Sequence, residues 1–169
     1  MPVRFSCALA ALVLLAAGPA RAQDCPQAYY TLTTQAAVDA FPATCTRVTG
    51  GIAIQGADIR DLAPLGALTS VGTHFTIQHN GALTSLDGLD GLTSVGTHFI
   101  IIGNAALTSL DGLDALTSVA SLLFIRANRA LAECAVGLRG VISGDPPAFT
   151  GVGSALIAAN APDGRCNTR

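Results

Sequence analysis

The sequence predicts a mainly β protein, a short parallel β-helix (a solenoid) of about five turns. The main observation is a repeat. The residues Leu-Thr-Ser-Val-Gly-Thr-His-Phe at 68–75 recur unchanged at 92–99, and 116–119 begin a third copy, so the period is 24 residues. A fixed period of this size is typical of solenoids. Two further observations agree with it: apolar residues recur in register through the copies, and cysteines stand outside the repeats at both ends.

Residues 1–22 have the features of a secretory signal peptide. Arg4 provides a positive start, residues 5–17 form an apolar run, and Ala-Arg-Ala at 20–22 is a small-x-small cleavage site. The apolar run is shorter than the roughly 20 residues that cross a bilayer. We therefore expect a secreted, periplasmic or cell-surface protein without a transmembrane anchor.

Residues 23–47 do not repeat and are predicted to form an N-terminal cap. Two threonines at 33–34 are N-cap candidates, Val38 and Phe41 stand three residues apart, and Pro42 ends the pattern, which together indicate a short amphipathic helix. A solenoid needs such a cap, because its first turn would otherwise expose the apolar core and unpaired strand edges.

Four cysteines remain after the signal peptide, an even number that favours disulfides in an exported chain. Four cysteines allow three pairings. We favour Cys25–Cys45 and Cys134–Cys166, because each pair brackets one end of the repeats and neither has to cross them. The sequence has no Cys-x-x-Cys and no cysteine/histidine cluster, so no zinc site is expected.

The repeat region, residues 48–132, arranges its apolar residues in seven columns. Phe75 and Ile77 alternate with polar residues as in a strand, whereas the leucines recur at every third residue, which suits neither a long strand nor an amphipathic helix. One coil per copy, with a short strand and tight corners, satisfies both patterns, and stacked coils pair their strands about 4.8 Å apart. The columns are Ile59/Leu83/Leu107/Leu131, Leu62/Leu86/Leu110, Leu65/Leu89/Leu113, Leu68/Leu92/Leu116, Val71/Val95/Val119, Phe75/Phe99/Leu123 and Ile77/Ile101/Ile125.

The first and last turns are degenerate copies of the repeat. Residues 48–54 match the following turn but precede a one-residue deletion, and residues 155–160 match 123–128. Residues 133–169 are therefore predicted to form a C-terminal cap that contains the last turn. Cys134 stands in a column otherwise filled by leucine, so the C-terminal cysteine pair is expected to start inside the core.

The repeat pattern resembles the receptor L-domain family. The resemblance rests on the spacing Phe/Leu-x-Ile-x-x-Asn-x-x-Leu-x-x-Leu-x-x-Leu-x-x-Leu-x-x-Val, on the opening segment Cys-Thr-Arg-Val-Thr-Gly-Gly-Ile-Ala-Ile at 45–54 and on the terminal cysteines, and it covers residues 25–166. It implies a right-handed, leucine-rich-repeat-like β-helix that binds protein ligands through one sheet face and has no catalytic motif. The cysteine-rich module, transmembrane helix and kinase of such receptors do not occur in the sequence, so only the fold and the binding tendency carry over.

An asparagine follows each predicted strand. Asparagines that face inward in stacked turns hydrogen-bond the turn backbone and one another. We therefore expect a structural ladder, and not a ligand site, from Asn80, Asn104, Asn128 and, in the last turn, Asn160.

Aspartates and histidines also recur, and each pattern has more than one interpretation. The Asp-Gly pairs at Asp87 and Asp111 would turn corners, but stacked carboxylates also suit calcium or the acid/base pair of a carbohydrate-active enzyme. His74 and His98 share an outward column that could hold a metal, yet His79 has the opposite parity and supplies no third ligand. We expect turn carboxylates and surface histidines, with no metal, no cofactor and no catalytic residue.

The outward positions of the strands differ from copy to copy. They are His-Thr-Gln in the copy of residues 74–78, His-Ile-Ile in 98–102 and Leu-Phe-Arg in 122–126. The apolar members are predicted to form one patch, which is either covered by residues 135–153 or contacts a partner or a second copy of the chain. The candidate binding residues on this face are Ile100, Ile102, Leu122, Phe124, Arg126, His74 and His98.

Composition narrows the function. The net charge is −2 and all nine basic residues are arginines that form no cluster, which argues against nucleic acid and anionic membranes as partners. No nucleophile elbow, phosphate loop or zinc-protease motif occurs. The sequence therefore indicates a non-enzymatic binding or adhesion module, outside the cell or on its surface, that recognises a protein or glycan partner. A structural envelope protein and a carbohydrate-active enzyme that uses the aspartate ladder are the alternatives.

Overall fold

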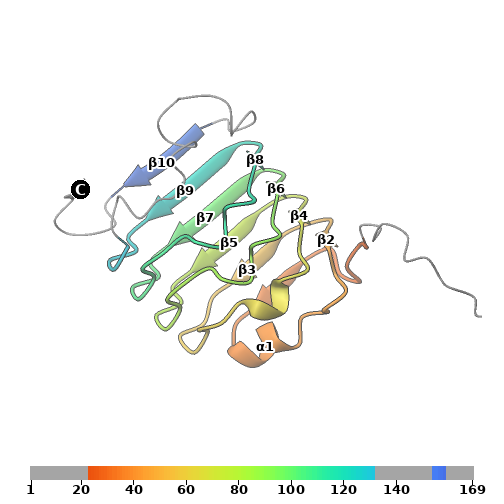
Figure 1. Ribbon diagram of the computed structural model, residues 1–169, viewed down its shortest axis with the longest axis horizontal. Coiled ribbons are helices and arrows are strands. Elements are labelled where there is room, and N and C mark those ends of the chain that lie inside the picture. Colours follow the sequence, from red (N-terminus) through yellow and green to blue (C-terminus); the bar gives the residue numbers. More distant parts are fainter. Residues whose placement is uncertain (1–22, 132–153, 159–169) are drawn as a thin grey trace, which may run out of the picture.

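The chain forms a solenoid of parallel strands, whose turns are stacked side by side in Figure 1. The computed structural model describes residues 23–131 and 154–158. Four turns each contribute one strand to a six-stranded sheet and one to a four-stranded sheet. The six-stranded sheet holds, in order, β1 (Tyr30–Leu32), β3 (Ile52–Ile54), β5 (Phe75–Gln78), β7 (His98–Ile102), β9 (Leu122–Arg126) and β10 (Ser154–Ala158). The four-stranded sheet holds β2 (Arg47–Val48), β4 (Ser70–Val71), β6 (Ser94–Val95) and β8 (Ser118–Val119).

Strand pairing follows the sequence repeat. Phe75 pairs with Phe99, and Phe99 with Leu123, so each residue lies beside its counterpart one period away. In the last turn Ala155 pairs with Leu123, as the match between these segments predicts. The predicted mainly β, parallel solenoid with a short N-terminal helix is therefore confirmed.

Two features go beyond the sequence prediction. The first is β1, which adds a strand to the larger sheet inside the predicted N-terminal cap and pairs with β3 from Tyr30↔Ile52 to Leu32↔Ile54. The second is the four-stranded sheet, because the prediction gave each copy one strand and the structure gives it two. The second strands are only two residues long and place their valines inward, as in Val71.

The core lies between the two sheets and is mainly aliphatic, with a few aromatic rings. All members of the seven predicted columns are buried, and none is more than 3% exposed. The two phenylalanines of one column, Phe75 and Phe99, stack with ring centroids 4.9 Å apart and an interplanar angle of 7°. A short 3-10 helix, η1 (Ala63–Leu65), forms the corner of the first turn with Pro64 near its start.

The N-terminal cap contains the predicted helix. The helix α1 (Gln35–Asp39) begins after Thr34, whose hydroxyl oxygen accepts the backbone N–H of Ala37 at 3.2 Å. Val38 and Phe41 are buried, and the ring of Phe41 packs against Tyr30 at 4.9 Å. The cap therefore joins the solenoid core through apolar contacts.

The predicted disulfide Cys25–Cys45 is present, with Cα atoms 4.8 Å apart. This bond is consistent with an extracellular location. The other predicted pair, Cys134–Cys166, lies outside the described residues, as do the predicted signal peptide at 1–22 and Asn160. In the described ranges, no helix has the length and apolar character that spanning a membrane requires.

The asparagine column forms a continuous buried ladder. Asn80, Asn104 and Asn128 are all 0% exposed. The side-chain nitrogens of Asn80 and Asn104 donate to Oδ1 of the asparagine in the next turn at 3.0 and 3.1 Å. They also donate to the carbonyls of Ile54 and Ile77 in the preceding turn, at 3.1 and 3.0 Å. The ladder satisfies backbone groups that would otherwise be buried without a partner.

The residue before each of these asparagines has a left-handed backbone. The φ angles are 53° at His79, 69° at Gly103 and 57° at Ala127. A residue other than glycine adopts this conformation at a cost of roughly 1–2 kcal/mol. The hydrogen bonds of the asparagine ladder offset that cost, because the same sharp corner brings each amide into the core.

A threonine ladder runs along another corner of the solenoid. The hydroxyls of Thr69, Thr93 and Thr117 donate to the carbonyls of Thr46, Thr69 and Thr93, respectively, over 2.9–3.1 Å. The two ladders hold neighbouring turns in the same register at separate corners.

We predict that Asn104→Ala destabilises the protein by roughly 2–4 kcal/mol, since it leaves a buried carbonyl at Ile77 and a buried N–H at Asn80 without their partner. Urea unfolding followed by circular dichroism measures this change. Thr108→Ala is the control, because it removes one exposed hydrogen bond to Thr84, and should cost less than about 1 kcal/mol. Equal effects of the two substitutions would contradict a structural role for the asparagine ladder.

A matched pair of glycines tests the corner geometry. Gly88 has φ +97°, and an added Cβ would overlap the carbonyl of Leu62, whereas a Cβ at Gly81 would meet nothing within 4 Å. Gly88→Ala should therefore cost at least about 2 kcal/mol in unfolding free energy, and Gly81→Ala should stay within about 1 kcal/mol of the parent. The urea midpoint of each variant provides the comparison, and a tolerated Gly88→Ala would refute this corner geometry.

Candidate functional site

The outer face of the six-stranded sheet is the candidate binding face. Side chains alternate along each strand, and in β7 Phe99 and Ile101 point into the core while His98, Ile100 and Ile102 point outward. The same alternation in β5 and β9 places the predicted outward residues on one surface. The regular pairing of the strands therefore aligns these residues in columns across the sheet.

The four apolar candidates come together on β7 and β9. Ile100 pairs with Phe124, so their side chains are neighbours, and Ile102 and Leu122 flank this pair along the two strands. We call these four residues the apolar patch. All four are half-buried. The segment 135–153, one of the predicted covers for the patch, lies outside the described residues.

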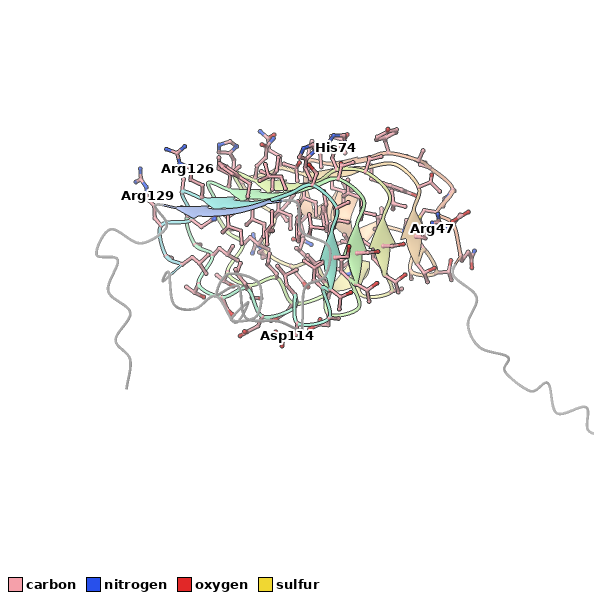
Figure 2. All side chains as sticks on the ribbon, turned by 90° about the horizontal axis from the view of Figure 1, so that it is seen from above. Arg47, His74, Asp114, Arg126 and Arg129 are labelled. Carbon is pink, nitrogen blue, oxygen red and sulfur yellow. A yellow bond between two sulfur atoms is a disulfide. The ribbon has the colours of Figure 1, made fainter. Side chains whose placement is uncertain are left out.

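Arg126 borders the apolar patch. It pairs with Ile102 at the end of β9 and is exposed. Figure 2 shows Arg126 and Arg129 on the same side of the molecule as His74, with Asp114 on the opposite side. In residues 23–131, Arg126 forms no ion pair, so its guanidinium is available to a partner.

His74 and His98 stack on the same face. Their ring centroids are 5.3 Å apart and their planes differ by 18°, as expected for one column on neighbouring strands. His79 follows β5 at the left-handed corner, outside this column. Across the described ranges, no three His, Cys, Asp or Glu side chains form a group that could hold a metal ion.

A surface hollow of about 170 Å³ lies at the other end of the face, over β1, β3 and β5. Tyr29, which is 65% exposed, contributes to its lining together with Gly51, Ala53, His74 and Thr76. Sequence reasoning missed this hollow, because Tyr29 belongs to no repeat and joins the face only through the pairing of β1. The glycine pair at 50–51, a break in the strand pattern, was the one sequence signal for it.

The aspartates behave as turn residues. The carboxylate of Asp87 accepts the hydroxyl of Ser85 at 2.8 Å, and that of Asp90 accepts the N–H of Gly88 at 2.9 Å. Gly88 and Gly112, which follow Asp87 and Asp111, have φ angles of 97° and 95°. These contacts favour the interpretation of Asp-Gly as a corner over calcium binding or catalysis.

The face thus offers two chemistries on one rigid surface: an apolar patch with a free cation at its border, and a hollow with an aromatic side chain and hydroxyl groups. No known protein family, curated protein or solved structure matches the chain.

We predict that Asp87→Ala combined with Asp111→Ala leaves a folded protein that loses less than about 2 kcal/mol, because both side chains are exposed and contribute only to turns. Thermal unfolding measures the loss, and a reducing-sugar assay on soluble glycans checks for hydrolysis. A carbohydrate-active enzyme would release reducing ends with the parent protein and stop with the double variant, which would overturn the turn interpretation.

Proposed function

We propose that the protein is an exported, non-enzymatic binding module whose apolar patch contacts a protein partner. The observation that carries the proposal is the in-register pairing of Ile100 with Phe124, which gathers four large apolar side chains at the surface of one sheet. Contiguous apolar side chains at a protein surface are typical of interaction sites, which supports a partner at this part of the sheet.

The chemistry of the patch favours a protein over a sugar as its partner. Phe124 provides an aromatic anchor surrounded by branched aliphatic side chains, and such anchors dominate protein–protein binding energies. Arg126 at the border favours an acidic group on the partner, since opposite charges at the rim steer association and set orientation. The strands hold these side chains in place before binding, which reduces the entropy lost on association.

Export is part of the same proposal. The signal-peptide features of residues 1–22 and the disulfide Cys25–Cys45 both support a location outside the cytoplasm. The resemblance of the repeat to receptor L-domains supports binding through a sheet face. A second copy of the chain is the alternative occupant of the patch.

We predict that Ile100→Asp combined with Phe124→Asp weakens partner association at least tenfold, because two charges would be buried against an apolar surface. Cross-linking in the cells that produce the protein, followed by mass spectrometry, identifies the partner, and titration calorimetry with that partner measures the affinity. Light scattering of the purified protein detects association of two copies.

The matched control for this experiment is Gln27→Asp combined with Gln55→Asp. Both side chains are exposed, and Gln27 precedes β1 while Gln55 follows β3, away from the patch strands β7 and β9, so the variant adds the same charge elsewhere. It should keep the affinity of the parent. A partner that binds the patch variant as tightly as the parent would exclude the proposed surface.

A further inference from the structure

The hollow at the N-terminal end of the face lies where a column of side chains is interrupted. Tyr30 pairs with Ile52, so the preceding Tyr29 stands beside Gly51, and the column continues through His74 and His98. At Gly51 the column has no side chain. The hollow therefore opens between an aromatic ring and an imidazole, over a floor of backbone and the small side chain of Ala53.

The glycines at this point keep the hollow open and position the tyrosine. An added Cβ at Gly51 would lie 2.9 Å from the carbonyl oxygen of His74 and 3.2 Å from Oγ1 of Thr73. An added Cβ at Gly50 would lie 2.9 Å from two ring carbons of Tyr29. The ring thus rests against glycine backbone, and yet 65% of the residue stays exposed.

The polar groups around the hollow are neutral hydroxyls and an imidazole. Thr31, His74 and Thr76 line it, and within the described part of the chain their side-chain polar atoms form no hydrogen bond. The described lining includes no Asp, Glu, Lys or Arg. The hollow therefore combines one exposed aromatic surface with several hydrogen-bonding groups, and its described lining has no carboxylate, ammonium or guanidinium group for an ionic ligand.

We propose that this hollow binds a neutral sugar ring of a glycan. The apolar face of the ring would lie against Tyr29, and its hydroxyls would hydrogen-bond to Thr31, His74 and Thr76. A phenylalanine, tyrosine or tryptophan side chain of a peptide would stack equally well but brings at most one polar atom to these three groups, whereas a sugar ring brings several. The volume of about 170 Å³ is below the roughly 300–1,000 Å³ of sites for drug-sized ligands, which fits one ring.

This site adjoins the apolar patch, because Thr76, which lines the hollow, pairs with Ile100 of the patch. The stacking ring and the aromatic anchor lie further apart: Gly51, beside Tyr29, lies next to β3 and Phe124 on β9, three strands away in the sheet order, which corresponds to about 14 Å at a spacing of about 4.8 Å. A glycan in the hollow and a protein on the patch would therefore occupy one face together. The sugar site does not depend on the protein partner proposed above.

The tyrosines of the chain provide a direct assay. The protein has two tyrosines and no tryptophan, so its ultraviolet fluorescence comes from Tyr29 in the hollow and from Tyr30, which is buried. We expect a saturable change in tyrosine fluorescence when the purified protein is titrated with at least one of five neutral hexasaccharides: those of cellulose, chitin, laminarin, mannan and amylose. Acidic oligogalacturonate and the peptide Gly-Tyr-Gly are the comparison probes, the peptide being followed by proton NMR.

Three variants test the assignment. Tyr29→Ala should weaken sugar binding at least roughly tenfold, because it removes the stacking surface, and Tyr29→Phe should keep binding within about threefold, because it keeps the ring. Phe124→Asp alone should bind the sugar as the parent does, because Phe124 on β9 lies two strands from Thr76 on β5, which separates sugar binding from binding of the protein partner. Binding of Tyr29→Ala is followed by isothermal titration calorimetry, and circular dichroism confirms its fold.

Several results would overturn the proposal. No response to any of the five neutral sugars, unchanged affinity of Tyr29→Ala, or stronger binding of oligogalacturonate would each exclude a neutral sugar ring in this hollow. Saturable binding of Gly-Tyr-Gly without binding of a sugar would assign the hollow to an aromatic peptide side chain instead.

Discussion

The stacked turns depend on the corner that follows each strand of the six-stranded sheet, where backbone polar groups are buried. The asparagine ladder stabilises this corner, because it provides hydrogen-bond partners for those groups. The corner turns through a left-handed residue, which is His79 in one turn and Ala127 in another. Asn80 and Asn104 each donate to the next asparagine and to a carbonyl of the preceding turn, and Asn128 donates to the carbonyl of Ile101. The ladder therefore fixes the spacing of the turns, and through it the register of all strands whose outward side chains form the candidate face.

The asparagine ladder ends at the first turn of the solenoid, which has no preceding turn to pair with. Side chains of the N-terminal cap make the hydrogen bonds that such a turn would make. The backbone N–H of Gly56, where other turns have asparagine, donates to Oδ1 of Asn80 and closes the ladder. The amide oxygen of Gln35 accepts the N–H groups of Arg60 and Asp61, and its nitrogen donates to the carbonyl of Asp61. The helix α1 can thus cap the end of the solenoid, because the side-chain amide of Gln35 provides the hydrogen-bond donor and acceptor that the backbone of a further turn would provide.

The repeat made most of the fold predictable, because a period of 24 residues sets which residues stack. Phe75 to Ile77 and their counterparts alternate clearly enough to be recognised as strands, and their pairing agrees with the columns. The strands of the four-stranded sheet were not recognised, since alternation cannot be read in two residues such as Ser70 and Val71. Strand β1 was missed because it has no repeated counterpart in the sequence.

The sequence predicted one part of the candidate site, the apolar patch, and not the other, the hollow. The apolar patch follows from columns and strand parity, so the sequence alone is enough to place its residues on β7 and β9. The hollow does not follow from the sequence, because it requires the register of β1 against β3 and the packing of Tyr29 on glycine backbone. The half-burial of the patch residues does not follow from the sequence either, because the spacing of residues does not give how much of each side chain is covered.

The inward and outward positions of the strands differ in how much they vary between copies, and the varying outward positions are where we expect function. Inward positions keep the same residue types from turn to turn, because stacking allows little else, but the outward positions change from His-Thr-Gln to Leu-Phe-Arg on an unchanged backbone. Since the strands pair equally well with either set, folding does not require the difference. A parallel sheet of this kind is a rigid surface on which each turn can present different chemistry, at little cost in binding entropy. The two ends of the face, one with a tyrosine over glycine and one with Phe124 beside an arginine, are accordingly best understood as adjoining surfaces for different ligands.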